Sequence, residues 1–411
     1  MPTRYAIVIA VDGLRASALG AYGNTWHPTP ALDRLASESH VFDWMIADSP
    51  QLAGFYRAAW FGLEAPRDGV ERKLTQLGNV PNLARRFEST GIQTALTTDD
   101  QWVAEQADQL GFSEVRGLEF PEPTTAEAVA DTELAQLFAI AADQIESWSV
   151  AGAETTSPPR LLWIHASGYH GAWDAPTELR QSLLDEEDPP ALEFVVPTAR
   201  LETSDHDEQL LHRSAYAAQT MVLDQCVGML LETLEAAGLA DSTLIALVGC
   251  RGFALGEHGA VGSDVRELYS ELTHVPLIVR LPGGAAAPPP RSSALIQPRE
   301  VAPLLMRWFD ATPEQTASRA VITSDDAVAA AIRGAVFSSG QNGEIAVRTG
   351  SWSLRQTGEN ALSVTKSATV ELFSKPDDRW EANEIADRCP DEAAAMLALA
   401  AEFRHTAHAA L

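Results

Sequence analysis

The sequence predicts an α/β protein: a mostly parallel sheet sandwiched between helices, followed by a small antiparallel sheet with one terminal helix. Apolar runs rich in Ile, Val and Leu alternate with helical patterns along most of the chain, which is typical of parallel βα units. After about Ala320 the pattern changes to short strands with hairpin-like turns. We therefore expect an α/β domain over residues 1–320 and a small C-terminal subdomain over residues 321–411.

The predicted strands of the first domain are, except for residues 93–97, largely apolar runs, as expected for strands buried on both faces. They cover residues 5–11, 93–97, 161–165, 242–249 and 275–280. Three of them lead directly into polar residues. Because ligand sites lie at the carboxyl ends of parallel strands, we expect Asp12, residues 165–170, Cys250 and Arg251 along one rim.

The predicted helices cover residues 31–39, 82–90, 125–147 and 212–237. Pro30 lies near the start of the first, and glycines at 91 and 238 end the second and the fourth. In the C-terminal part we expect strands at 343–347, 352–356 and 370–373 and a helix at 391–410. These elements predict an antiparallel sheet with one helix packed on it.

The chain is strongly acidic, with a formal net charge of −28 over 411 residues. Such a surface repels nucleic acid and anionic membranes, so neither is an expected partner. The charge also opposes binding of an anionic substrate unless the site carries local positive charge. Its simplest effect is to keep a soluble protein from associating with itself.

Cysteine usage and the N-terminus both favour a reduced, cytoplasmic protein. Cys226, Cys250 and Cys389 form a sparse, odd set without the spacing of a disulfide framework or a zinc site. The first apolar run is too short for a signal peptide. No later run is long enough to span a bilayer.

Several segments in order resemble the sulfatases of the alkaline phosphatase superfamily. They are DGLRASALGAYGNTWHPTPALDRLA with the following SPQLAGFYRAAWFG (within residues 12–62), YAAQTMVLDQCVGMLLETLEAAGLADSTLIALVGCRGFALGEHG (216–259), LYSELTHVPLIVRLPGG (268–284), and the tail TGSWSLRQ with ELFSKPDDRWEANEIAD. The resemblance covers nearly the whole chain and implies the sulfatase fold. It also implies the chemistry of a sulfuric ester hydrolase, which needs a nucleophile, a cation and an acid for the leaving alcohol.

Family members use a formylglycine made from the first residue of a Cys-x-Pro-Ser-Arg segment, and bind Ca²⁺ through carboxylates. In this sequence the nucleophile position falls on Ala53 if Arg57 is taken as the motif arginine, or on Leu52 if the preceding Ser-Pro is used. Neither side chain can become an aldehyde. The first metal position matches Asp12, but the second is Gly13, which has no ligand atom.

The second pair of family metal positions is also altered. In GCRGFALGEHG the aspartate aligns with Cys250 and its neighbour with Arg251. A guanidinium where Ca²⁺ should lie opposes the ion, because like charges about 4 Å apart repel by some kcal/mol even at an effective dielectric near 20. The family lysines align with Ser263 and, approximately, with Asp99, and a family histidine with Gln101. We therefore expect no Ca²⁺ cofactor.

Two residues of the family site are retained, His170 and Arg57. Each also has a simpler interpretation. A single histidine in a glycine-rich loop is commonly a hydrogen-bonded loop residue, and Arg57 could end a helix or pair with Asp12.

Two functional hypotheses follow. The first is a pseudoenzyme that binds a protein or a small anionic ligand and does not hydrolyse, with Arg251 replacing the cation and neutralising Asp12. The alternative is a divergent sulfuric or phosphoric ester hydrolase with a rearranged site. There Cys250 could serve as nucleophile, with its pKa lowered by the adjacent arginine, although a buried inert thiol is the commoner interpretation of such a residue.

Two further sequence patterns each have both a functional and a structural interpretation. The run ETSDHDEQ (202–209) could hold a metal through Asp205, His206 and Asp207, but such runs are usually solvated loops. Trp173 and Asp174 could line a pocket for a sugar or aryl group, or anchor a loop.

Overall fold

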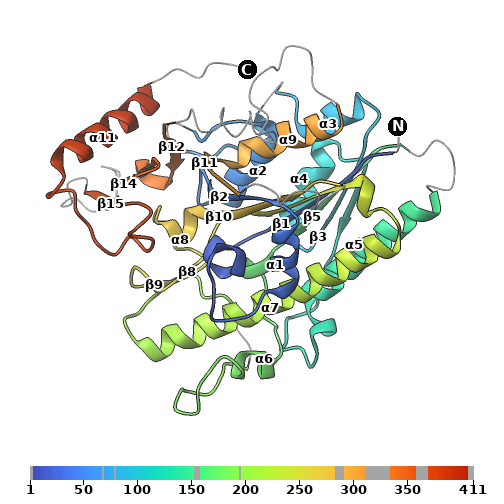
Figure 1. Cartoon of the computed structure of the whole chain (residues 1–411), viewed down its shortest axis with the longest axis horizontal. Coiled ribbons are helices and arrows are strands. Elements are labelled where there is room, and N and C mark those ends of the chain that lie inside the picture. The colour runs from blue at the N-terminus through green and yellow to red at the C-terminus, as the bar shows by residue number, and fades with distance from the viewer. Residues whose placement is uncertain are drawn as a thin grey trace.

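The computed structural model describes residues 3–66, 69–77, 80–151, 158–193, 196–282, 291–310, 334–357 and 369–405. Its centre is an eight-stranded sheet (Figure 1). In spatial order the strands are β11 (Arg291–Ile296), β2 (His40–Ile46), β10 (His274–Arg280), β7 (Thr243–Gly249), β1 (Tyr5–Val11), β5 (Arg160–Ala166), β3 (Gln93–Thr98) and β4 (Glu114–Gly117).

The sheet is mostly parallel, as the sequence predicts. Only β10 runs against its neighbours, pairing antiparallel with β7 on one side and β2 on the other. At the centre, the last residue of β1, Val11, lies opposite Ala166 of β5 and Gly249 of β7. The residues that follow these three strands therefore meet at one edge, which confirms the predicted rim.

Helices cover both faces of the sheet (Figure 1). One face packs against α1 (Pro30–Ser37), α5 (Glu133–Ala151) and α7 (His206–Ala236), and the other against α2 (Leu52–Phe61), α3 (Leu83–Glu88), α4 (Gln101–Leu110) and α9 (Val301–Trp308). Two short helices, α6 (Thr177–Gln181) and α8 (Ser270–Thr273), lie in connections. Each face buries its own apolar cluster, which provides most of the driving force for this three-layer packing.

A smaller antiparallel sheet follows the large one. Its strands are β12 (Val336–Ser339), β13 (Ile345–Arg348), β14 (Trp352–Gln356) and β15 (Val370–Ser374), and α11 (Pro390–His405) packs on it through a separate apolar cluster. Near the edge of the large sheet, β6 (Leu201–Glu202), β8 (Ala254–Leu255) and β9 (Ala260–Gly262) form a third, three-stranded sheet.

Two predicted helix boundaries are wrong. The helix expected from residue 125 begins at Glu133, because the Asp174 carboxylate accepts a hydrogen bond from the Glu133 amide and the preceding residues run as loop and a single 3₁₀ turn. The helix expected from residue 212 begins at His206, since Asp205 caps it. The last residues of the predicted terminal helix, 406–410, lie outside the described residues. None of the described helices combines the length and the apolar character needed to cross a bilayer.

Candidate functional site at the carboxyl edge of the sheet

Asp12 lies at the centre of the edge, directly after β1. Its side chain is 2% exposed, and its amide donates to the carbonyl of Ala166 at 3.0 Å. The next residue, Gly13, has a φ of +79°, and a Cβ placed there would lie 2.7 Å from the Cβ of Tyr169. A carboxylate at position 13 therefore cannot be accommodated without moving the backbone or Tyr169.

Arg251, which follows β7, forms a two-pronged ion pair with Asp12. Its Nε donates to Asp12 Oδ1 at 2.8 Å and its Nη2 to Oδ2 at 2.9 Å. The remaining prong, Nη1, donates to the carbonyl of Pro50 at 3.1 Å, just before α2. The fork geometry is the one in which arginine binds a carboxylate most strongly. Both oxygens of Asp12 are thereby occupied by protein donors.

The pKa values of the two paired groups are shifted in opposite directions, and each shift favours the charged form. Burial alone would raise the pKa of Asp12, but the charges of Arg251 and His170 outweigh it and lower the pKa to about 2. For Arg251, burial would lower the pKa, and the Asp12 carboxylate instead raises it. Both groups are therefore charged at every physiological pH, and each neutralises the other.

Leu52 and Ala53, the two possible nucleophile positions, occupy the first turn of α2 beside this pair. Together with Arg251 they line a cavity of about 740 Å³. Three carboxylates and four cations surround this cavity: Glu71, Asp100, Glu105, Arg72, Lys73, Arg251 and Arg266. Because Arg251 is neutralised by Asp12, the remaining charges balance, and the cavity does not form a strongly positive anion site.

Arg57 does not pair with Asp12, which corrects that alternative. Its Nη2 donates to Asp48 at 2.9 Å, its Nε to Glu71 at 3.1 Å, and its Nη1 to the carbonyl of Leu63 at 2.5 Å. The three charged side chains are at most 6% exposed. Arg57 therefore connects α2 to the segments before and after it. Its charge is neutralised by Asp48 and Glu71.

His170 does lie near Asp12, with its Nε2 4.0 Å from Oδ1. Burial lowers the pKa of His170 to about 4, although Asp12 opposes this, so the ring is neutral at pH 7. The ring packs against Phe253, and its Nε2 has no hydrogen-bond partner among the described residues. The structure thus brings Asp12, Arg251 and His170 together and leaves Arg57 apart.

Cys250 is fully buried beneath the pair, with its Sγ 4.0 Å from Nδ1 of His165. Burial raises the pKa of the Cys250 thiol well above its usual value, and the charge of Asp12 adds to the effect while Arg251 opposes it. The adjacent arginine therefore does not produce a thiolate. This geometry favours the inert-thiol interpretation over the nucleophile.

Thiol labelling should distinguish the three cysteines. We expect a maleimide at pH 7 to modify partly exposed Cys389 rapidly, and Cys226 and Cys250 only when the protein is unfolded, because both are buried. Mass spectrometry of digested protein would assign the sites, with Cys389→Ser as a control that removes the rapid phase. Fast, selective modification of Cys250 in folded protein would contradict this expectation and support cysteine chemistry.

The other aligned positions have structural roles. Asp99 accepts a hydrogen bond from the Ser167 amide at 2.7 Å, and burial raises its pKa to about 6. Gln101 is the exposed first residue of α4, and Ser263 donates to the carbonyl of Thr198. Neither Asp99 nor Ser263 supplies the positive charge of a family lysine.

The two patterns with open alternatives are also structural. Asp205 caps α7, accepting from the amides of Asp207 and Glu208, and the run around it is exposed. Trp173 is fully buried and donates through Nε1 to the carbonyl of Tyr169 at 2.8 Å. Trp173 and Asp174 therefore anchor a loop and do not line a sugar pocket.

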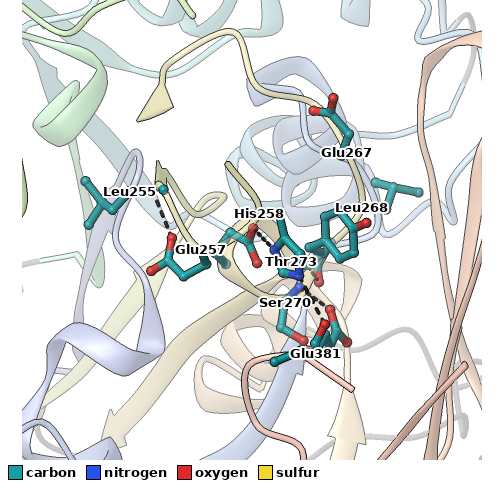
Figure 2. Close-up of polar contacts among 12 residues, drawn as sticks. Leu255, Glu257, His258, Glu267, Leu268, Ser270, Thr273 and Glu381 are labelled. Atoms are coloured by element: carbon teal, nitrogen blue, oxygen red, sulfur yellow. Dashed lines mark hydrogen bonds and ion pairs between the residues drawn. The ribbon is translucent and has the colours of Figure 1, made fainter. Parts of the chain in front are cut away.

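The side chains of the Gly-Glu-His-Gly segment point to different parts of the protein (Figure 2). Glu257 accepts from the Leu255 amide at 3.1 Å and pairs with Arg15 at 2.6 Å. His258 bonds Glu271 at 2.6 Å and the carbonyl of Glu381 at 3.2 Å. The Glu381 carboxylate in turn accepts from the Ser270 amide at 2.8 Å. This segment therefore fastens the end of the large sheet to the residues that follow the small one.

The donor set at the edge does not fit the family's Ca²⁺. Calcium takes six to eight oxygen ligands, whereas the aligned positions supply one carboxylate already held by arginine, a glycine, a buried thiol and the arginine itself. Within the ranges that the structure describes, no group of three or more His, Cys, Asp or Glu side chains is arranged to hold a metal.

Some contacts at this site have no signal in the sequence. Asp48 and Glu71 as partners of Arg57, and the Pro50 carbonyl as partner of Arg251, depend on how distant segments pack. Asp48 and Arg57 are the only charged residues in the otherwise uncharged stretch 48–57, which is the one sequence pattern that could have suggested their pairing.

Comparison with known proteins gives a consistent result. A sequence model of the sulfatase family matches residues 4–311. Iduronate 2-sulfatase from Homo sapiens is 40% identical over 103 residues, which are 25% of this chain and 18% of that protein. N-acetylglucosamine-6-O-sulfatase from Bacteroides thetaiotaomicron is 42% identical over 67 residues, 16% of this chain and 12% of that protein. The matched stretches thus span less than a fifth of these relatives.

Solved structures share the fold over almost the whole chain. A 2-O GAG sulfatase has a TM-score of 0.71 at 16% identity, covering 98% of this chain and 92% of that one. The phosphonate monoester hydrolase of Agrobacterium radiobacter has a TM-score of 0.68 at 16% identity, covering 97% and 94%. Since the family model matches most of the sequence and the architecture agrees, this chain belongs to the sulfatase family.

Proposed function

We propose that this chain is a non-hydrolytic member of the sulfatase family, a pseudoenzyme. The observation that carries the proposal is the two-pronged ion pair between Arg251 and Asp12. An arginine at one family metal position satisfies both oxygens of the carboxylate retained at another. A divalent ion would have to displace the partly buried Arg251 guanidinium from a fully buried carboxylate, which costs several kcal/mol.

The second support is steric and lies at Gly13. A ligand side chain there would meet Tyr169 at 2.7 Å, so the missing carboxylate cannot be restored by substitution alone. The backbone at this position is adapted to glycine. The metal site is therefore altered in two independent ways.

The third support is the lack of a nucleophile at the start of α2. Leu52 and Ala53 carry only apolar groups, and the buried thiol of Cys250 is held protonated. Groups of this kind act together, and loss of the nucleophile alone lowers kcat by on the order of a millionfold in a protease with a comparable interdependent site. The divergent hydrolase thus has no activated nucleophile at this edge of the sheet.

The function left to such a scaffold is binding or assembly. The cations that line the 740 Å³ cavity are balanced by carboxylates, so this cavity suits a polar surface of a partner protein better than a free sulfate ester. We propose a protein or small anionic ligand as partner, with no Ca²⁺ cofactor and no ester hydrolysis.

Turnover of 4-nitrophenyl sulfate and of 4-nitrophenyl phosphate tests the proposal directly. We expect both rates to equal the uncatalysed rate, with or without added Ca²⁺ or EDTA. Elemental analysis after dialysis against Ca²⁺ should give much less than one ion per chain.

The Asp12→Ala variant is the matched control, because activity from a contaminating hydrolase would be the same in both preparations. Turnover that EDTA abolishes and that Asp12→Ala removes would refute the proposal. Stoichiometric Ca²⁺ that survives dialysis in the wild type but not in Asp12→Ala would refute it equally.

A further inference from the structure

A second cavity has a volume of about 310 Å³, and Asp12 is not among its lining residues. It opens between the segment after β1, the first half of α7 and the loop before α11. Its lining includes Arg15, Trp26, Arg213, Glu257, Arg379 and Trp380. It shares no lining residue with the cavity over α2. Its volume is at the low end of small-molecule sites, which suits a ligand with one ring.

Two half-exposed tryptophans border this cavity. Trp26 is 46% exposed and Trp380 is 49% exposed. They are two of the four large hydrophobic residues that are exposed in the described part of the chain. Indole faces left open to solvent beside a cavity offer stacking surfaces for a flat or cyclic group.

The same cavity contains positive charge that the protein does not neutralise. Arg213 donates to the carbonyl of Leu255 at 3.0 Å and has no carboxylate partner within the described ranges. Arg379 donates to the carbonyl of Tyr22 at 2.8 Å, stacks 5.0 Å from the Trp380 ring centre, and likewise has no carboxylate partner there.

The single acid among these lining residues is already engaged. Glu257 pairs with Arg15 at 2.6 Å, and Figure 2 shows its carboxylate turned to Leu255. Burial lowers the pKa of Arg379, and the charge of Arg15 lowers it further. In a chain of net charge −28, Arg213 and Arg379 line one cavity without a carboxylate partner among the described residues, and such a pair is a site for an anion.

One uncharged donor adds to the site. His27 lines the cavity, is 7% exposed, and neither of its ring nitrogens has a hydrogen-bond partner among the described residues. A buried polar group without a partner is costly unless a ligand or water satisfies it.

We propose that this cavity binds a small organic anion made of one ring and one sulfate or carboxylate group. The ring packs on Trp26 and Trp380, and the anionic group accepts hydrogen bonds from Arg213 and Arg379. The ring is either a sugar or an aromatic ring, and both present an apolar face to indole. The proposal does not depend on the loss of hydrolysis, because the cavity contains none of the residues on which that loss rests.

Isothermal titration calorimetry of the full chain at low salt tests the site. The probes are glucose 6-sulfate, benzoate, glucose and inorganic sulfate. We expect glucose 6-sulfate or benzoate to bind at one site per chain. The probe with the lower dissociation constant then identifies the ring as a sugar or an aromatic ring. Glucose and inorganic sulfate should each bind at least about tenfold more weakly, because glucose lacks the anionic group and inorganic sulfate lacks the ring.

Trp380→Ala and Arg213→Gln should each weaken binding of the tighter probe by about tenfold. If Arg213→Gln does not fold, Trp26→Ala provides a second test, because the half-exposed Trp26 side chain can be removed with little effect on folding. Arg85→Gln removes an exposed arginine of α3 and should leave binding unchanged. No binding of either anion at 10 mM, or equal binding by the wild type, Trp380→Ala and Trp26→Ala, would overturn the proposal. Neither outcome bears on the turnover assay.

Discussion

Replacing Arg251 with alanine is expected to lower the free energy of unfolding by about 3–5 kcal/mol. The change leaves the Asp12 carboxylate, 2% exposed, without the two hydrogen bonds that hold it. The bond to the Pro50 carbonyl is lost as well. Urea unfolding followed by circular dichroism at pH 7 measures the effect as a shift of the midpoint at unchanged slope.

The effect of this substitution should depend on pH. In the wild type the pKa of Asp12 is depressed to about 2, so its stabilising contribution is present above the unfolded pKa of about 3.9 and is lost as pH falls toward 2. In Arg251→Ala, burial dominates and raises the pKa of Asp12 above its unfolded value. The carboxyl then destabilises at neutral pH and ceases to do so once it is protonated. The difference between the two proteins should therefore be largest at pH 7 and shrink on acidification.

The double variant Asp12→Ala/Arg251→Met tests whether the loss of stability in Arg251→Ala comes from the unpaired Asp12 carboxylate. Removing both charges leaves no buried ion without a partner, so it should be more stable than Arg251→Ala alone. A double variant less stable than Arg251→Ala, or a single variant within about 1 kcal/mol of wild type, would show that the pair does not have the energetic role assigned to it.

Arg57→Ala is the second substitution with a large expected effect, again about 3–5 kcal/mol of lost unfolding free energy. It leaves Asp48 and Glu71 buried side by side with no positive partner in the cluster. Burial already raises the pKa of Asp48, and only the Arg57 charge opposes this strongly. The same urea titration at pH 7 measures the loss.

Arg34→Ala is the matched comparison for Arg57→Ala. Arg34 pairs with Glu235 at 2.6 Å, but the two side chains are 52% and 42% exposed. Exposed pairs of this kind contribute about 0–1 kcal/mol. If Arg57→Ala cost no more than Arg34→Ala, the buried cluster around Arg57 would be of little importance to stability.

The sequence predicted five of the eight strands of the large sheet and the edge at which the residues following them meet. Runs such as residues 5–11 and 244–249 are apolar throughout, a composition typical of strands buried on both faces. The order of motifs then fixed which residues meet beyond those strands. The ion pair between Arg251 and Asp12 followed from this, because two opposite charges delivered to adjacent strand ends have no better partner.

Other features could not be predicted, for identifiable reasons. The strand β2 contains Asp43 and Trp44 amid apolar residues, so it lacks the uniform pattern of the central strands. The start of α5 depends on Asp174, 41 residues away, as well as on the local cap Thr132, whose Oγ1 accepts from the Ala135 amide at 3.2 Å. The partners of Arg57 and the cavity beside Trp26 and Trp380 are likewise products of tertiary packing.

The arginine at position 251 affects how the stability of this fold depends on ions in solution. A dissociable ion stabilises a protein by mass action, to a degree set by its free concentration relative to the dissociation constant. Here the positive charge is covalently tethered to the end of β7 and arrives as that strand forms. We therefore expect the edge of the sheet to need no loading step and its stability to be the same at any calcium level.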